Sequence, residues 1–229
     1  MHRLTQVNIG SLIALSLSVS FGPVQAMDDH AQHNMDEHAQ HMTQQSTVMK
    51  QESARVTFAD VQLVNQDGKS VRLEPDLVAD KIVLMGFIYT SCTTVCPVVS
   101  AIMKKTEVQL QANAGPPVQL ISISVDPLRD TPEQLRRYAQ SYMGAGDAWS
   151  WLTGKPQAIT DTLKQLGAWS PDLKEHPALI MIGDGRSGQW TRFYGFSDPN
   201  ILVAKIQEIQ LSRAKYEAQH IAGHEGSQQ

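Results

Sequence analysis

The chain has 229 residues, of which 41% are hydrophobic and 18% are charged, and this length accommodates one well-buried domain with terminal extensions. Its 19 basic and 23 acidic residues give a formal net charge of −4, which argues against nucleic acid as a partner, because binding to phosphates needs clustered positive charge. Only two cysteines are present, which is too few for a disulfide scaffold in a domain of this size.

Residues 1–26 have the pattern of an export signal. Arg3 precedes an apolar stretch from Ile9 to Phe21, and small residues ending at Ala26 suit a cleavage site. An uncleaved membrane anchor is the alternative, although the apolar stretch is short for a complete span. We therefore expect an exported, periplasmic protein, either soluble or tethered to the membrane by an uncleaved signal.

Residues 27–52 are polar and lack the apolar periodicity of a folded segment, so we expect a disordered linker. Two near-identical octapeptides, residues 27–34 and 35–42, are rich in methionine, histidine and acidic side chains. Thioether and imidazole groups suit copper, so the Met27–Met42 repeat is a candidate for weak copper capture. The alternative is a solvated tail without a ligand, since many polar low-complexity tracts are only linkers.

Residues 53–213 carry the apolar patterns of a folded domain. The predicted elements, in chain order, are hairpin strands 56–64 and 69–73, a buried strand 81–88, a helix 97–111, a buried strand 118–125, a helix 131–142, a helix marked by Ile159, Leu163 and Leu166, strands 178–182 and 189–194, and a helix that starts at Asp198–Pro199 and carries Leu202, Ile206 and Ile209. An Asp-Gly turn marks the hairpin, and Thr131 with Gln134 has the spacing of a capping box.

This order of elements predicts an α/β fold, a mixed sheet flanked by helices with an N-terminal β-hairpin extension. After the last helix, residues 214–229 are expected to form a flexible tail that contains His220 and His224.

Cys92 and Cys96 lie where the first buried strand ends and the next helix begins. This is the crevice position at the carboxyl edge of an α/β sheet, and a helix N-terminus there favours thiolate. With three residues between them, both sulfurs can point into one pocket, close enough for a disulfide or for capture of one soft metal ion. Two ordinary buried cysteines are the alternative, but core packing gives no reason to place two thiols at this edge.

His176 is the only histidine inside the predicted domain, and it directly precedes Pro177 and a predicted strand. Spacing alone favours a surface or packed histidine over a ligand. If His176 does join Cys92 and Cys96, two thiolates and one imidazole suit Cu(I) or Cu(II) and are one ligand short of a closed zinc site.

Four motifs together resemble the Sco/SenC copper chaperones over roughly Val56 to Ile209. They are the segment Phe87–Pro97 with its two cysteines, the segment Ile123–Pro132, His176, and Tyr194–Gly195. The resemblance implies a thioredoxin-like fold and one tight copper site held by Cys92, Cys96 and His176. It further implies a role in assembling the dinuclear copper centre of cytochrome c oxidase.

Other positions of these motifs have weaker expectations. The resemblance implies that Asp126 supports the copper site from the outer shell, whereas Arg129 and Asp130 are interpreted mainly as turn and helix-cap residues. Thr93 stands where many family members have proline, and Pro177 stands where they often carry a hydroxyl residue.

Two functions of different classes remain open. One is a metallochaperone that hands copper to an oxidase subunit, and it requires His176. The other is an extracytoplasmic thiol–disulfide oxidoreductase that reduces the cysteines of the copper acceptor, with Cys92 and Cys96 as its redox-active pair and a thioredoxin-like reductant as a second partner. The Met/His repeat favours copper, while Pro177 favours the redox function, because thioredoxin-type reductases place a proline beside their pocket.

Overall fold

The computed structural model describes residues 50–58, 60–112, 115–142 and 149–225. The predicted signal and the Met27–Met42 repeat lie outside these residues. None of the helices within the described ranges combines the length and the hydropathy that crossing a bilayer requires.

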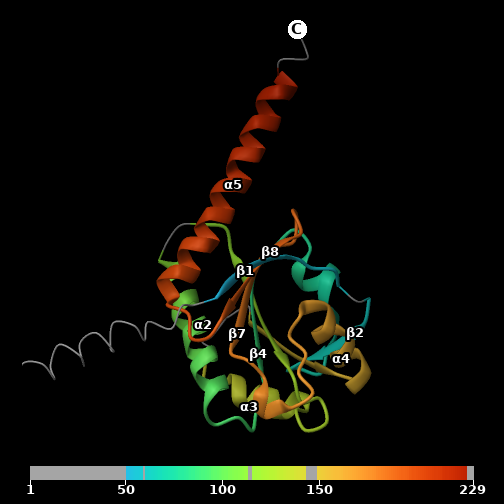
Figure 1. The fold of residues 1–229 in the computed structure, drawn as a ribbon. Helices are drawn as coiled ribbons and strands as arrows, with labels where there is room; N and C mark the ends of the chain where they lie inside the picture. The colour runs from blue at the N-terminus through green and yellow to red at the C-terminus, as the bar shows by residue number, and fades with distance from the viewer. Residues whose placement is uncertain (1–49, 59, 113–114, 143–148, 226–229) are drawn as a thin grey trace, which may run out of the picture. The chain divides into compact units, whose positions relative to one another are not determined.

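A mixed eight-stranded sheet forms the centre of the described domain (Figure 1). Its strands are β1 (Gln51–Arg55), β2 (Gln62–Asn65), β3 (Ser70–Arg72), β4 (Ile82–Ile88), β5 (Val118–Ser124), β6 (Trp149–Gly154), β7 (Leu179–Asp184) and β8 (Gln189–Tyr194). They follow the order β1-β8-β7-β4-β5-β6-β2-β3. The pairs β4–β5 and β5–β6 are parallel and the other neighbours are antiparallel. The predicted mixed sheet is therefore confirmed.

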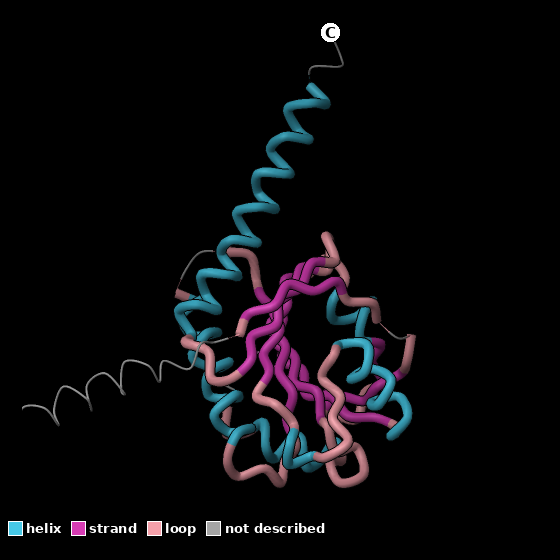
Figure 2. Tube along the Cα trace, in the orientation of Figure 1, coloured by secondary structure: helices cyan, strands magenta, loops and turns pink. Residues whose placement is uncertain are grey.

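Helices cover both faces of this sheet (Figure 2). They are the π-helix η1 (Leu73–Val78), α2 (Val95–Gln111), α3 (Pro132–Ala139), α4 (Pro156–Leu166), the 3-10 helix η2 (Leu173–Glu175) and α5 (Pro199–Glu225). One hydrophobic core lies between the sheet and α4 with η1, and a second lies between the sheet and α2, α3 and α5. All seven residues of β4 are buried, because its alternating side chains enter both cores.

The packing of α2 on β4 fixes the start of α2 against the sheet. Gly86 permits this close approach, because a Cβ atom there would lie 2.5 Å from the Met103 Sδ of α2. In the parallel pairing, Ile88 at the end of β4 is opposite Ser124 at the end of β5. The segments that follow these two strands therefore leave the sheet at the same edge.

The N-terminal hairpin is present, but its strands are shorter than predicted. The Asn65 side chain accepts the backbone N–H of Lys69 at 2.9 Å, and Gly68 in the turn has a φ of 75°. The preceding residues form β1, which pairs with β8 and begins inside the predicted linker 27–52. The domain boundary predicted at residue 53 is therefore corrected to Gln51. The linker pattern extended too far because a short edge strand with exposed polar residues resembles a linker.

Two further segments differ from the sequence prediction. β6 was not predicted, although its Trp149 and Trp151 are almost completely buried. α5 continues to Glu225, into the segment predicted as the flexible tail 214–229. The Arg186 guanidinium contacts Glu217 at 2.7 Å, which ties this part of α5 to the β7–β8 turn.

The capping box of α3 is confirmed, since Thr131 and Gln134 exchange both hydrogen bonds.

Candidate functional site

The two cysteines lie together at the start of α2, directly beyond the end of β4. The helix begins at Val95, two residues before the predicted start, so Cys96 lies in its first turn. The backbone N–H of Cys96 donates to the Cys92 Sγ at 3.3 Å. Both thiols are free, and Cys92 and Cys96 are only 7% and 3% exposed. The predicted juxtaposition at the sheet edge is therefore present.

The two thiols differ in acidity. Burial raises the pKa of Cys92, but hydrogen bonds from the Cys96 thiol, from the backbone at Cys96 and Thr94 and from Tyr89 outweigh burial and lower it to about 7. Burial and the hydrogen bond to Cys92 raise the pKa of Cys96 to about 12. Near neutral pH the pair therefore consists of one thiolate-forming sulfur and one thiol.

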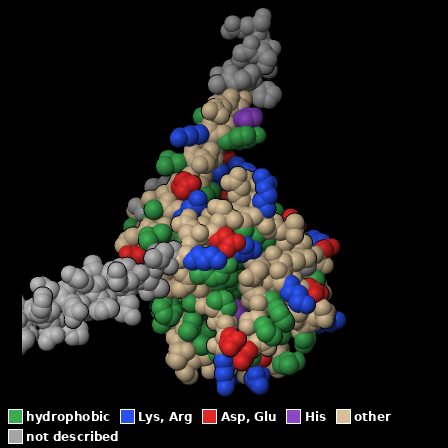
Figure 3. Space-filling model, viewed as in Figure 1, with side chains coloured by type: hydrophobic (Ala, Val, Ile, Leu, Met, Phe, Trp, Pro, Cys, Tyr) green, Lys and Arg blue, Asp and Glu red, His purple; other side chains and the backbone are tan. Residues whose placement is uncertain are grey.

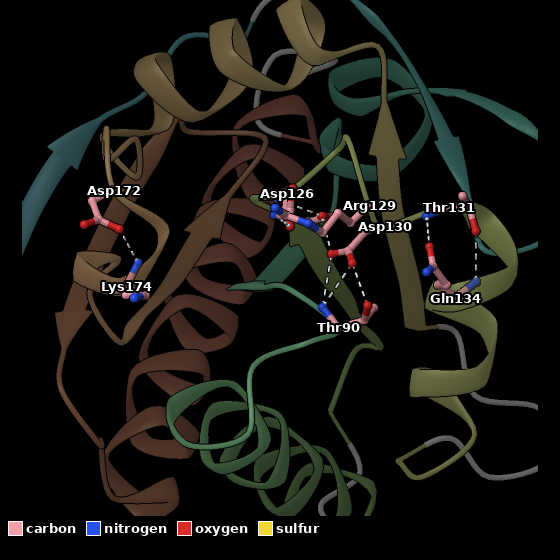
Figure 4. Close-up of polar contacts among 9 residues, drawn as sticks. Thr90, Asp126, Arg129, Asp130, Thr131, Gln134, Asp172 and Lys174 are labelled. Atoms are coloured by element: carbon pink, nitrogen blue, oxygen red, sulfur yellow. Dashed lines mark hydrogen bonds and ion pairs between the residues drawn. The ribbon is translucent and has the colours of Figure 1, made fainter.

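Asp130 connects the segment after β5 to the cysteine loop (Figure 4). Its carboxylate accepts the Thr90 backbone N–H at 3.1 Å, the Thr90 hydroxyl at 2.6 Å and the Ser124 hydroxyl at 2.6 Å. Asp130 is 1% exposed, and this burial raises its carboxyl pKa in spite of the hydrogen bonds from Ser124 and Thr90. The interpretation of Asp130 as a turn residue holds for its backbone, whose N–H donates to the Asp126 carbonyl at 2.9 Å, but its carboxylate caps no helix and instead joins β5 to the loop that leads to Cys92.

Asp126 also follows β5 at the sheet edge where the cysteines lie, but its carboxylate pairs with the Arg129 guanidinium rather than with the cysteine loop. It is 4% exposed and accepts the Arg129 guanidinium at 2.8 Å (Figure 4). Burial raises the pKa of Tyr89 to about 12, the hydrogen bond to Cys92 adds to this shift, and the negative charge of Asp126 contributes as well. Asp126 thus lies close enough to act on the site electrostatically, while its predicted outer-shell role toward copper stays a prediction.

His176 lies at the end of η2, just before β7, the strand that pairs with β4 on the side opposite β5. Its Nε2 is 3.1 Å from the carbonyl oxygen of Ala168, and its ring centroid is 6.1 Å from that of Phe87. Burial lowers the pKa of the imidazole, although the Ala168 carbonyl opposes this shift. The loop that carries His176 therefore enters the sheet beside the end of β4, where the loop that carries the cysteines leaves it.

The structure does not bring all three predicted ligands together. Across the described part of the chain, no three His, Cys, Asp or Glu side chains form a group that could hold a metal ion. Cys92 and Cys96 meet, whereas the imidazole of His176 is bound to the Ala168 carbonyl. Because this carbonyl accepts the proton of Nε2, the lone pair of the neutral ring is on Nδ1, and Nδ1 is the nitrogen through which His176 could join a three-ligand site.

Comparisons with known proteins agree on one family. The SCO1/SenC family model matches residues 49–210. A Stutzerimonas stutzeri protein whose name describes it as copper-binding is 31% identical over 157 residues, which cover 69% of each chain. The SCO1 protein homolog of Bacillus subtilis is 42% identical over 94 residues, or 41% of this chain and 47% of the relative. The match thus spans about half the length of that relative.

Solved structures show the same fold. BsSco, a member of the Sco family of cytochrome c oxidase assembly proteins, superposes with a TM-score of 0.60 at 27% identity, covering 70% of this chain and 96% of BsSco. Yeast Sco1 gives a TM-score of 0.59 at 22% identity, covering 69% and 99% of the two chains. The sheet with its flanking helices is therefore the thioredoxin-like architecture of the Sco structures.

Proposed function

Because the chain belongs to the SCO1/SenC family, we propose that it binds copper and delivers it to the dinuclear copper site of cytochrome c oxidase. The observation that carries this proposal is the pair of nearly buried thiols at the N-terminus of α2, one of which has a pKa of about 7. Thiolate is the form that binds soft metals, and two thiolates favour Cu(I) over harder cations. An oxidase subunit that accepts copper is the proposed partner.

The proposed ligands of the single tight site are Cys92, Cys96 and His176. Since burial lowers the pKa of His176, its imidazole is neutral near pH 7, which is the form that binds a metal. The Ala168 carbonyl accepts the proton of Nε2 at 3.1 Å, so the lone pair of the neutral ring is on Nδ1, and we assign Nδ1 as the copper ligand with the carbonyl hydrogen bond retained. Asp126 and its Arg129 partner then stabilise the charge of the site from outside the ligand set.

We further propose that the chain is exported by residues 1–26 and that the Met27–Met42 repeat captures additional copper weakly. Deleting residues 27–42 from the full chain should lower the copper bound in excess metal while one tight equivalent remains. Metal analysis after dialysis measures this number. An unchanged copper content would show that the repeat is only a linker.

The difference in thiol acidity favours a second candidate function, the reduction of the disulfide of the copper acceptor. In this reaction the Cys92 thiolate attacks one acceptor sulfur and forms a mixed disulfide, and the other acceptor sulfur leaves as a thiolate. Cys96 then loses its proton and attacks Cys92. The products are a Cys92–Cys96 disulfide and a reduced acceptor dithiol, so two electrons pass to the acceptor. A thioredoxin-like reductant would restore the pair.

Substitution of His176 separates the two functions. His176→Ala removes one proposed ligand but leaves both thiols and the start of α2 in place. Copper affinity, measured against a competing chelator, should fall by more than the 10–100-fold typical of outer-shell changes. Reduction of a model disulfide should continue at the parent rate, because this rate depends on thiolate fraction and access.

Glu175→Ala is the matched control, because this exposed neighbour in η2 changes the same segment without removing a proposed ligand. It should preserve copper affinity. If His176→Ala binds copper as tightly as Glu175→Ala, the three-ligand site is wrong and the oxidoreductase function becomes the better explanation.

A further inference from the structure

Four large apolar side chains are exposed at the end of the domain that carries the two cysteines. They come from four different segments and are exposed by between 41% and 81%: Val98, Leu128, Trp169 and Phe196. These four residues are called the apolar rim below. Figure 3 shows hydrophobic side chains on the surface of the lower half of the domain, the end at which α3 lies in Figure 1. Exposed apolar side chains that gather at one place mark a surface that another molecule covers.

Two members of the rim are placed by α2 and β5. Val98 lies in the first turn of α2, two residues after Cys96. Leu128 follows β5, in the segment whose Asp130 carboxylate accepts the Thr90 hydroxyl of the cysteine loop at 2.6 Å. Both residues therefore lie at the sheet edge where β4 and β5 end.

The other two members lie on the far side of β4. Phe196 follows β8, which runs parallel to β4 because each is antiparallel to β7, so β8 ends at the same edge. The N–H of Gly195 donates to the carbonyl of Ala178 at 2.9 Å, two residues after His176. Trp169 directly follows the residue whose carbonyl binds His176. The rim thus has members on both sides of the cysteine loop.

The segments that follow the strands at this edge expose a single charge. These segments are 89–94 after β4, 125–131 after β5 and 195–197 after β8, and their only charged residues are Asp126, Arg129 and Asp130. Both carboxylates are buried, whereas the Arg129 side chain is 68% exposed. Arg129 donates one N–H to Asp126 at 2.8 Å, and its other guanidinium N–H groups have no partner among the described residues. A carboxylate of another molecule can therefore pair with Arg129.

We propose that the apolar rim docks a protein loop in which the cysteines of the copper acceptor are flanked by apolar side chains and one carboxylate that pairs with Arg129. This inference rests on the proposed function for the identity of the acceptor. A sulfur that exchanges with Cys92 must come within about 2 Å of its Sγ, so the residues beside that sulfur are brought onto the rim. A polar, charged small thiol such as glutathione leaves the rim uncovered. The rim therefore selects protein thiols over small ones.

The test measures how fast Cys92 reacts with peptides that differ only in the residues beside their cysteine. It uses the full chain with Cys96→Ser, so that the mixed disulfide at Cys92 persists. In each pentapeptide the cysteine is joined to 5-thio-2-nitrobenzoate. The Cys92 thiolate bonds to the peptide sulfur, the bond to the nitrobenzoate sulfur breaks, and the coloured thiolate leaves. The probes are Leu-Glu-Cys-Trp-Leu, Leu-Gln-Cys-Trp-Leu and Ser-Gln-Cys-Ser-Ser. Each rate is divided by that of the same peptide with 2-mercaptoethanol, which removes differences in intrinsic reactivity.

The probe with apolar residues and glutamate should react about tenfold faster than the serine probe, because apolar side chains of probe and rim leave water together. It should react about threefold faster than its glutamine counterpart, and high salt should reduce this difference, because an exposed ion pair is screened. Leu128→Ser combined with Phe196→Ser should abolish the preference for apolar probes. The serine probe should keep its rate in this rim variant, because Cys92 itself is unchanged.

Leu211→Ser combined with Tyr216→Ser is the matched control. Both side chains are exposed apolar groups of α5, and they lie more than ten residues beyond its start at the cysteine edge. This variant should keep both preferences. The Cu(I) affinity of the rim variant with both cysteines present should equal that of the parent, and this measurement tests the proposed function separately. A parent chain that fails to bind Cu(I) would refute the proposed function, while the probe rates alone decide the role of the rim.

Equal rates with all three probes, or a preference that survives in the rim variant, would overturn the inference. Two further measurements then identify the occupant. Binding to phosphatidylglycerol vesicles that is lost in the rim variant would assign the rim to a membrane surface. Dimerisation of the parent that is lost in the rim variant would assign it to a second copy of the chain. Either result, together with equal probe rates, would replace the acceptor loop proposed here.

Discussion

Replacing Asp130 by alanine should destabilise the folded protein by about 3 kcal/mol, because it strands three hydrogen-bond donors at the base of the cysteine loop. The Ser124 hydroxyl is completely buried, so its loss of a partner costs about 1–3 kcal/mol. The Thr90 N–H and hydroxyl are half-buried and recover part of their loss from water. Removing the buried carboxylate itself offsets some of the total. Asp130→Asn retains one acceptor oxygen and should cost about half as much.

Urea unfolding of the reduced, metal-free chain at pH 7 measures these differences. Asp172→Ala is a suitable control, since this exposed carboxylate accepts the Lys174 N–H at 2.8 Å (Figure 4) and should contribute about 1 kcal/mol or less. In the same Asp130 variants, the rate of alkylation of Cys92 at pH 7 should fall, because a loosened loop no longer fixes the donors that lower its pKa. The reasoning is refuted if Asp130→Ala unfolds at the same urea concentration as Asp172→Ala.

Three further outcomes follow from the charges described above. Because Cys92 and Cys96 have pKa values of about 7 and about 12, copper binding should release about 1.5 protons at pH 7 and about one at pH 8, and titration in buffers of different ionisation enthalpy checks this number. Tyr89→Phe removes a hydrogen bond to Cys92 and should shift the alkylation profile of that thiol to higher pH; an unchanged profile would contradict this role. Arg213→Ala should cost about 2–3 kcal/mol at pH 7. Burial raises the pKa of Asp184, but Arg213 and a backbone N–H outweigh burial and lower it, so this stabilisation exists above about pH 4 and disappears as the pH falls through the lowered pKa. Denaturation should therefore show a smaller difference between parent and variant at pH 2.5 than at pH 7, and the part that remains comes from the hydrogen bond of Arg213 to the Asp80 carbonyl.

Local patterns were sufficient for much of the fold. The continuous apolar run at β4 and the capping box at Thr131 each describe interactions within one segment, and both are present. The pairing of Cys92 with Cys96 was predictable for the same reason, because a strand end and a helix start fix their separation. β1 was not predicted, because its pairing with β8 comes from the far end of the chain.

The parts of the site that depend on distant segments were less predictable. The function of Asp130 arises from its contacts with Thr90 and Ser124, which no spacing within its own turn reveals. A possible signal was the presence of two aspartates and one arginine in the Asp126–Asp130 segment: once Arg129 pairs with Asp126, the second carboxylate needs partners from elsewhere. For His176 the sequence predicts a ligand only through family resemblance, and the structure shows a different partner, the Ala168 carbonyl.

The position of β4 at the centre of the sheet has a consequence for the order in which the protein is made. On one side β4 pairs with β5, which begins 30 residues after the end of β4 in the chain. On the other side it pairs with β7, which begins 91 residues after that end and is therefore synthesised much later. The cysteines therefore leave the ribosome long before the strand that supports them has both neighbours. Formation of such long-range pairs is slow compared with local helix formation. During this interval Cys92 lacks the hydrogen bonds from the start of α2 and from Tyr89 that lower its pKa to about 7, so it has the reactivity of an ordinary accessible thiol until the domain has folded.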